Sequence, residues 1–180
     1  MEELAYLQRG EIILYPTDTI WGLGCDATNK EAIKKIIELK QRPKNKSILL
    51  LVSDREMLRN YVEEIPKKAL ELLDEIKEPL TIIYPKAKNL PIEYLSNDET
   101  IGIRIPKNEY CQRLIKALSL PLVSTSANIS GEKSPTCFNE ISEEIKKGVS
   151  YIANIPKQES TKHNSIIYIV KENNDYERIR

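Results

Sequence analysis

The apolar residues of this chain recur with the period of helices in some segments and in the short runs typical of strands in others. From Asn29, whose side chain can cap a helix, apolar positions recur at helical spacing as far as Leu39. Ser53 and Glu56 have the spacing of a capping box, which predicts a short helix. The helical spacing predicts further helices over residues 2–9, after Pro66, over 109–118 and over 140–147.

The uninterrupted apolar run at 48–52 predicts a strand that is buried on both faces. Shorter patterns predict strands over 11–15, 80–84, 100–105, 120–123, 165–170 and 176–179. Since helices and strands alternate, we expect the α/β class, with one mixed sheet covered by helices. A length of 180 residues suits a single domain over 1–180.

Composition excludes several classes of protein. Lys and Arg total 27 and Asp and Glu total 27, and this balance argues against a protein held on nucleic acid by its overall charge. The longest apolar run, 48–52, is far shorter than the roughly 20 residues of a membrane-spanning helix. The first ten residues lack the basic and apolar regions of a signal peptide, so we expect a cytoplasmic protein without a membrane partner.

The cysteines and the histidine limit the chemistry. Cys25, Cys111 and Cys137 are odd in number and far apart, so neither a disulfide framework nor a zinc site is indicated. A catalytic triad or a multi-histidine metal centre would depend on His163 alone. We therefore expect a site without a protein-bound metal, built from Lys, Arg, hydroxyl and backbone groups.

The segment PTDTIWGLG at 16–24 follows the first strand and presents Thr17, Asp18 and Thr19 in a loop. Its two glycines would let a ligand approach the backbone closely. The alternative is a plain turn, with Trp21 packed in the core.

The segment LKQRPKNKS at 39–47 concentrates positive charge between a helix and the most apolar strand. Such a cluster suits a polyanion such as a triphosphate, or a carboxylate. The alternative is that Lys40 and Arg42 only complement the dipole at the helix C-terminus. The four cations are Lys40, Arg42, Lys44 and Lys46.

Two later strands also carry polar groups. Thr100, Gly102 and Arg104 share one face of a strand, and the small glycine leaves room for a ligand there; the alternative is an exposed arginine. The strand at 120–123 leads into a loop, 124–136, that is crowded with hydroxyl and amide groups. Such groups suit phosphates, a ribose or an amino acid, whereas a polar surface loop is the alternative. They include Ser124, Ser126, Asn128 and Ser134.

Together these segments resemble the YrdC-like family, the threonylcarbamoyl-AMP synthases, from about residue 3 to residue 170. The resemblance is carried, in order, by PTDTIWGLG, Lys40-Gln41-Arg42-Pro43, Pro79-Leu80-Thr81, GIRIP and STSANISG. It implies a twisted mixed sheet with helices on both faces and an open concave face. It also implies synthesis of threonylcarbamoyl-AMP from L-threonine, bicarbonate and ATP with Mg²⁺, releasing pyrophosphate. A downstream transferase complex would use this product to modify an adenosine of tRNA.

The resemblance also implies roles for individual residues. Lys40 and Arg42 match the basic element that binds ATP phosphates or the threonine carboxylate, and they are the catalytic candidates. The expected threonine-binding residues are Thr17, Thr19, Arg104 and Ser124. The expected ATP-binding residues are Lys40, Arg42, Thr100, Ser126, Asn128 and Ser134.

The sequence departs from the family pattern at Ser47, at Lys77-Glu78 and at Asn164-Ser165-Ile166. It also ends near residue 180, so we expect it to lack the extra C-terminal domain of longer members. Two other functions stay open at this point. One is an RNA-binding module without catalysis, in which the basic residues hold phosphates. The other is a paralogue with different carbamoyl chemistry.

Overall fold

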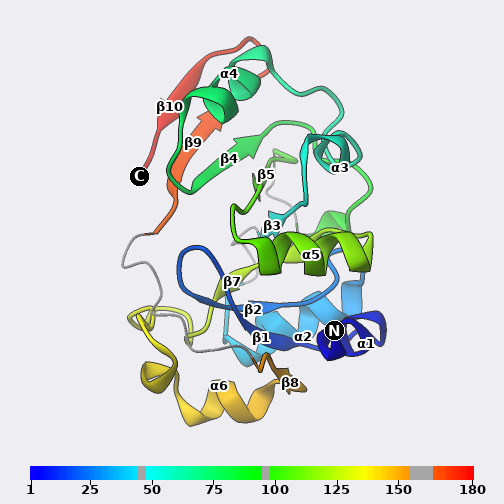
Figure 1. The fold of residues 1–180 in the computed structure, drawn as a ribbon. Helices are drawn as coiled ribbons and strands as arrows, with labels where there is room; N and C mark the ends of the chain where they lie inside the picture. Colours follow the sequence, from blue (N-terminus) through cyan, green and yellow to red (C-terminus); the bar gives the residue numbers. More distant parts are fainter. Residues whose placement is uncertain (44–47, 95–97, 155–163) are drawn as a thin grey trace.

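The computed structural model describes residues 1–43, 48–94, 98–154 and 164–180, and it contains two mixed β-sheets with α-helices packed against them (Figure 1). The α/β class is therefore confirmed, but the expectation of one sheet is wrong. Within the described residues, no helix is long and apolar enough to cross a membrane.

The first sheet has four strands in the order β7-β2-β1-β8. Strand β1 pairs antiparallel with β2 and parallel with β8, and β7 pairs antiparallel with β2. Part of the loop predicted at 16–24 is therefore strand, because β2 turns back along β1. The strands are β1 (Ile13–Pro16), β2 (Trp21–Gly24), β7 (Thr125–Ser126) and β8 (Tyr151–Ile152).

The second sheet has six strands in the order β10-β9-β4-β5-β3-β6. The predicted strand at 80–84 is confirmed at its full length, and the other predicted strands appear within two residues of their expected ends. The strands are β3 (Leu49–Leu51), β4 (Leu80–Tyr84), β5 (Ile101–Arg104), β6 (Leu122–Val123), β9 (Ile166–Val170) and β10 (Tyr176–Arg178).

The segment from Pro121 to Ala127 joins the two sheets. The backbone amide of Ser124 donates to the carbonyl of Leu49 in the second sheet, at 2.9 Å. The amide of Ala127 donates to the carbonyl of Trp21 in the first sheet, at 3.1 Å. The hydroxyl-rich loop predicted after residue 123 therefore begins where the sheets meet.

Helices cover both faces, as the alternation along the strands requires. In β1, Leu14 packs into a core formed with α2, α4 and α6, whereas Ile13 and Tyr15 pack into a second core with α1 and α5. The helices are α1 (Glu2–Gln8), α2 (Lys30–Leu39), α3 (Arg55–Arg59), α4 (Lys67–Glu75), α5 (Glu109–Leu118) and α6 (Glu143–Gly148), with short 3₁₀ turns η1 (Ile92–Tyr94) and η2 (Phe138–Glu140).

Local capping signals predicted some helix starts and not others; the helix expected over 140–147 begins only at Glu143, after its cap Ser142. The side chain of Asn29 accepts from the amide of Ala32 at 3.1 Å, as expected. The proposed capping box at Ser53 is wrong, because Asp54 caps α3 by accepting from the amide of Met57 at 2.9 Å. The hydroxyl of Ser53 instead donates to the Asp54 carboxylate.

Candidate functional site

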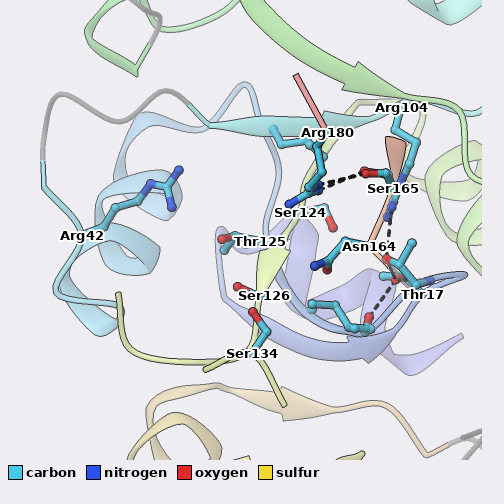
Figure 2. Close-up of a pocket in the computed structure, with 14 residues that line it drawn as sticks. Thr17, Arg42, Arg104, Ser124, Thr125, Ser126, Ser134, Asn164, Ser165 and Arg180 are labelled. Carbon is cyan, nitrogen blue, oxygen red and sulfur yellow. Dashed lines mark hydrogen bonds between the residues drawn. The ribbon is translucent and has the colours of Figure 1, made fainter. Parts of the chain in front are cut away.

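An open pocket of about 240 Å³ lies where the two sheets meet (Figure 2). Both sheets, and loops between them, contribute to its walls. The lining residues are Thr17, Thr19, Ile20, Gly22, Arg42, Leu49, Arg104, Ser124, Thr125, Ser126, Ser134, Asn164, Ser165 and Arg180. The pocket thus brings together most of the residues that the sequence singled out.

The loop between β1 and β2 forms a compact turn against the strand arginine. The hydroxyls of Thr17 and Thr19 lie 3.0 Å apart, and the Thr17 hydroxyl donates to the carbonyl of Ile20 at 2.7 Å. The Arg104 guanidinium donates to the Thr19 hydroxyl at 3.1 Å and lies 3.4 Å from the Asp18 carboxylate. These contacts fix the direction of the guanidinium before a ligand arrives.

Arg104 is only 5% exposed, although it lines the pocket. Its Nε atom is buried and has no hydrogen-bond partner among the described residues. A buried donor without a partner is costly, so a ligand oxygen would relieve that cost. Arg104 is therefore suited to bind an anion, and its role towards threonine stays a prediction.

The end of α2 determines how the basic element is arranged. The amide of Gln41 donates to the carbonyl of Glu38 and the amide of Arg42 donates to that of Ile37, which together form a Schellman motif. This motif places Gln41 in the left-handed region, with φ of 49°. The resulting reversal directs Lys40 into the protein and Arg42 to the pocket.

Lys40 is 2% exposed, and it is not among the lining residues. Its Nζ donates to the backbone carbonyls of Ser126 at 2.5 Å and Asn128 at 2.6 Å. Burial, and then the charge of Arg42, lower the pKa of Lys40 to about 8. In this structure Lys40 holds the 126–130 loop in place, and its predicted contact with substrate stays a prediction.

Two other predicted residues also lie outside the pocket lining. Asn128 donates from its side chain to the carbonyls of Ile129 and Glu132, both at 2.9 Å, and so shapes the loop. The Thr100 hydroxyl donates to Asp98 at 3.0 Å, away from the lining residues. The predicted cations Lys44 and Lys46 lie outside the described residues.

The pocket also contains residues that were not among the predicted site residues. Asn164 and Ser165 line the pocket at the point where the sequence departs from the family pattern. Arg180 donates from Nε to the Ser165 carbonyl at 3.1 Å, and the Ser165 hydroxyl lies 2.8 Å from that of Thr81. Figure 2 shows Arg104 and Arg180 on either side of Ser165, with Arg42 entering from the other side of the pocket. Arg180 reaches the pocket through the β9–β10 hairpin, whose two strands were predicted although the place of Arg180 was not.

The pocket lining carries more positive than negative charge, although Asp18 behind it is paired with Arg104. Arg42, Arg104 and Arg180 line it, and the described lining residues include no Asp or Glu. Burial lowers the pKa of Arg42, and burial followed by the charge of Arg104 lowers the pKa of Arg180. An anionic ligand would relieve both penalties, so the arrangement favours a ligand with carboxylate or phosphate groups.

Residues 5–180 match the Sua5/YciO/YrdC family, which is described as telomere recombination. The threonylcarbamoyl-AMP synthase of Pseudoalteromonas translucida is 32% identical over 163 residues, which are 89% of this chain and 87% of the relative. Further relatives, from Vibrio campbellii and Idiomarina loihiensis, carry the same name.

Solved structures show the same fold. P. abyssi Sua5 in complex with L-threonine superposes with a TM-score of 0.86 and 29% identity, over 94% of this chain and 50% of that one. This chain therefore spans about half of that longer protein. E. coli YciO superposes with a TM-score of 0.81 and 25% identity, over 99% of this chain and 86% of that one.

The chain belongs to the Sua5/YciO/YrdC family. Its curated relatives are enzymes of the nucleotidyltransferase type. The resemblance drawn from the sequence is thereby confirmed at the level of family and fold.

Proposed function

We propose that this protein joins L-threonine, bicarbonate and ATP into threonylcarbamoyl-AMP, with release of pyrophosphate and water. The observation that carries the proposal is a pocket with three arginines, many hydroxyls and no carboxylate among its described lining residues. Such a lining suits a reaction whose substrates are all anionic or carry a carboxylate. The names of the curated relatives support the same reaction.

L-Threonine would bind at the Arg104 side of the pocket. Arg104 and Thr19 form the fixed group of donors there, and Thr17 and Ser124 lie beside them. Its carboxylate would pair with the guanidinium of Arg104. The L-threonine complex of P. abyssi Sua5 supports an amino-acid site in this fold.

The ATP phosphates would bind between the arginines on opposite sides of the pocket. Arg42 and Arg180 supply charge, and Ser126 and Ser134 supply hydroxyl donors. Mg²⁺ would arrive on the phosphate oxygens as part of the ATP substrate. Lys40 and Asn128 would act indirectly, by holding the loop that carries these serines.

The chemistry depends on position and charge. The threonine amine attacks the carbon supplied by bicarbonate, and water leaves as the carbamate forms. A carbamate oxygen then attacks the α-phosphorus in line, while the bond to the β-phosphate oxygen breaks. Arginines near the departing pyrophosphate stabilise its negative charge, and neither step needs a covalent enzyme intermediate.

The proposal places the protein in the cytoplasm, upstream of a transferase complex that modifies tRNA. A coupled pyrophosphate assay tests it, with threonine, bicarbonate and ATP each omitted in turn. We expect pyrophosphate only when all three substrates and Mg²⁺ are present. Release that continues without threonine or without bicarbonate would contradict the proposal.

A further inference from the structure

A buried tyrosine, Tyr15, stands near the end of β1, two residues before Thr17 of the pocket lining. Tyr15 has 0% exposed surface, and its hydroxyl has no hydrogen-bond partner within ordinary limits among the described residues. An unpaired hydroxyl in an apolar core costs free energy, and phenylalanine would fill the same space without that cost. The hydroxyl therefore calls for an explanation that core packing does not give.

Two glycines of β2 make room for the Tyr15 ring and for the Ser124 side chain. Tyr15 in β1 is paired with Gly22 in β2. A Cβ on Gly22 would lie 3.5 Å from the Ser124 Oγ, and a Cβ on Gly24 would lie 2.6 Å from Cε1 of the Tyr15 ring and 3.1 Å from the Val123 carbonyl. The absence of both Cβ atoms leaves room for the Tyr15 ring beside Gly24 and for the Ser124 hydroxyl beside Gly22, on neighbouring positions of one strand.

The Tyr15 phenol keeps its proton at any ordinary pH. Burial raises its pKa far above the usual range, and the nearby Ser124 hydroxyl and the charge of Arg104 offset only part of this shift. A protonated phenol must donate if it is to be satisfied, and the Ser124 oxygen can accept. Ser124 itself lines the pocket, so its own proton is then left to face the ligand.

We propose that Tyr15 is a positioning residue that donates to the Ser124 hydroxyl and so fixes Ser124 as a donor to the carboxylate of bound L-threonine. The small shift that closes the Tyr15–Ser124 bond would accompany binding. This inference rests on the proposed function. It adds a residue that does not touch substrate and that the pocket lining does not include.

The test compares Tyr15→Phe, Ser124→Ala and the double variant by calorimetric titration with L-threonine, alongside the KM for threonine and kcat. Tyr84→Phe is the matched control, because Tyr84 is 1% exposed and lies outside the pocket lining. We expect Tyr15→Phe to weaken threonine binding about five- to tenfold, with kcat changing much less. The double variant should bind no more weakly than Ser124→Ala.

If Tyr15→Phe weakened threonine binding by the same factor in the wild-type and in the Ser124→Ala background, the inference would be overturned. The Tyr15 hydroxyl would then not act through Ser124. Unchanged threonine affinity in Tyr15→Phe would also overturn it. Urea unfolding should show Tyr15→Phe at least as stable as wild type, and a large loss of stability would assign the hydroxyl to folding instead. If the wild-type protein bound threonine but formed no product, only the proposed synthesis would be refuted. The titration would still test the role of Tyr15 in threonine binding. Failure of wild type to bind threonine would refute both.

Discussion

Replacing Arg104 with lysine tests how the pocket recognises threonine. Lysine keeps the positive charge near Asp18, which lies 3.4 Å from the guanidinium, so this partly buried carboxylate retains a counter-charge. Lysine lacks the planar guanidinium, whose several N–H groups could donate to Thr19 and to a carboxylate at the same time. The substitution therefore removes hydrogen-bond geometry while leaving charge in place.

The expected loss follows from the kind of bond removed. A hydrogen bond to a charged group contributes about 1.5–3 kcal/mol, so kcat/KM for L-threonine should fall about 10- to 150-fold. Since the carboxylate does not react, most of the change should lie in KM. Pyrophosphate release over a range of threonine concentrations measures both constants.

A matched control is Arg55→Lys. Arg55 forms a surface ion pair with Asp74, at 2.5 Å, and does not line the proposed substrate pocket. Its kcat/KM should equal that of wild type. If Arg104→Lys also retained the wild-type KM for threonine, Arg104 would not bind the carboxylate and the assignment would be wrong.

Three further variants test other parts of the account. The pKa of Lys40 is about 8, below its ordinary value of 10.5, because the side chain is buried. Burial of the charged ammonium therefore lowers the free energy of unfolding below pH 8. This cost declines as the pH rises from 8 towards 10.5. Urea unfolding from pH 7 to 10 should show wild type gaining stability relative to Lys40→Met, and parallel pH curves would refute the shift. Arg180→Gln should raise the KM for ATP about tenfold, measured by ATP titration, whereas an unchanged KM would remove Arg180 from the phosphate site. Gln41 adopts a left-handed φ of 49°, which costs a non-glycine residue about 1 kcal/mol. Glycine adopts this φ without that strain, so Gln41→Gly should raise Tm by about 2–4 °C in a thermal melt. An unchanged or lower Tm would contradict this.

Elements with strong local signals could be predicted from the sequence. Helix α5 has its expected bounds, because Asn108 caps it by accepting from the amide of Cys111 and its apolar face repeats at helical spacing. The choice of cap at α3 was wrong because Ser53 and Asp54 are adjacent and both can cap a helix. The local sequence pattern does not show which of the two residues caps α3. In the structure Asp54 has the extended backbone of an N-cap residue, directly before the first turn of the helix.

Features that depend on distant contacts could not be predicted. The division into two sheets depends on β2 pairing with β7, about one hundred residues later. Lys40 resembles a phosphate ligand in sequence, but the carbonyls of Ser126 and Asn128 surround its ammonium in the fold. Arg180 enters the pocket because β9, which carries the β9–β10 hairpin, pairs with β4, about eighty residues earlier. Pairing across long stretches of chain is not encoded in any local spacing.

The origin of the carbonyl carbon in the product tests the central claim most directly. The protein is incubated with ATP, Mg²⁺, L-threonine and ¹³C-bicarbonate, and the nucleotide products are analysed at once by mass spectrometry. We predict an adduct of threonine and AMP that carries one ¹³C atom and is absent when threonine is omitted. Formation of AMP or pyrophosphate without a labelled adduct would contradict the account.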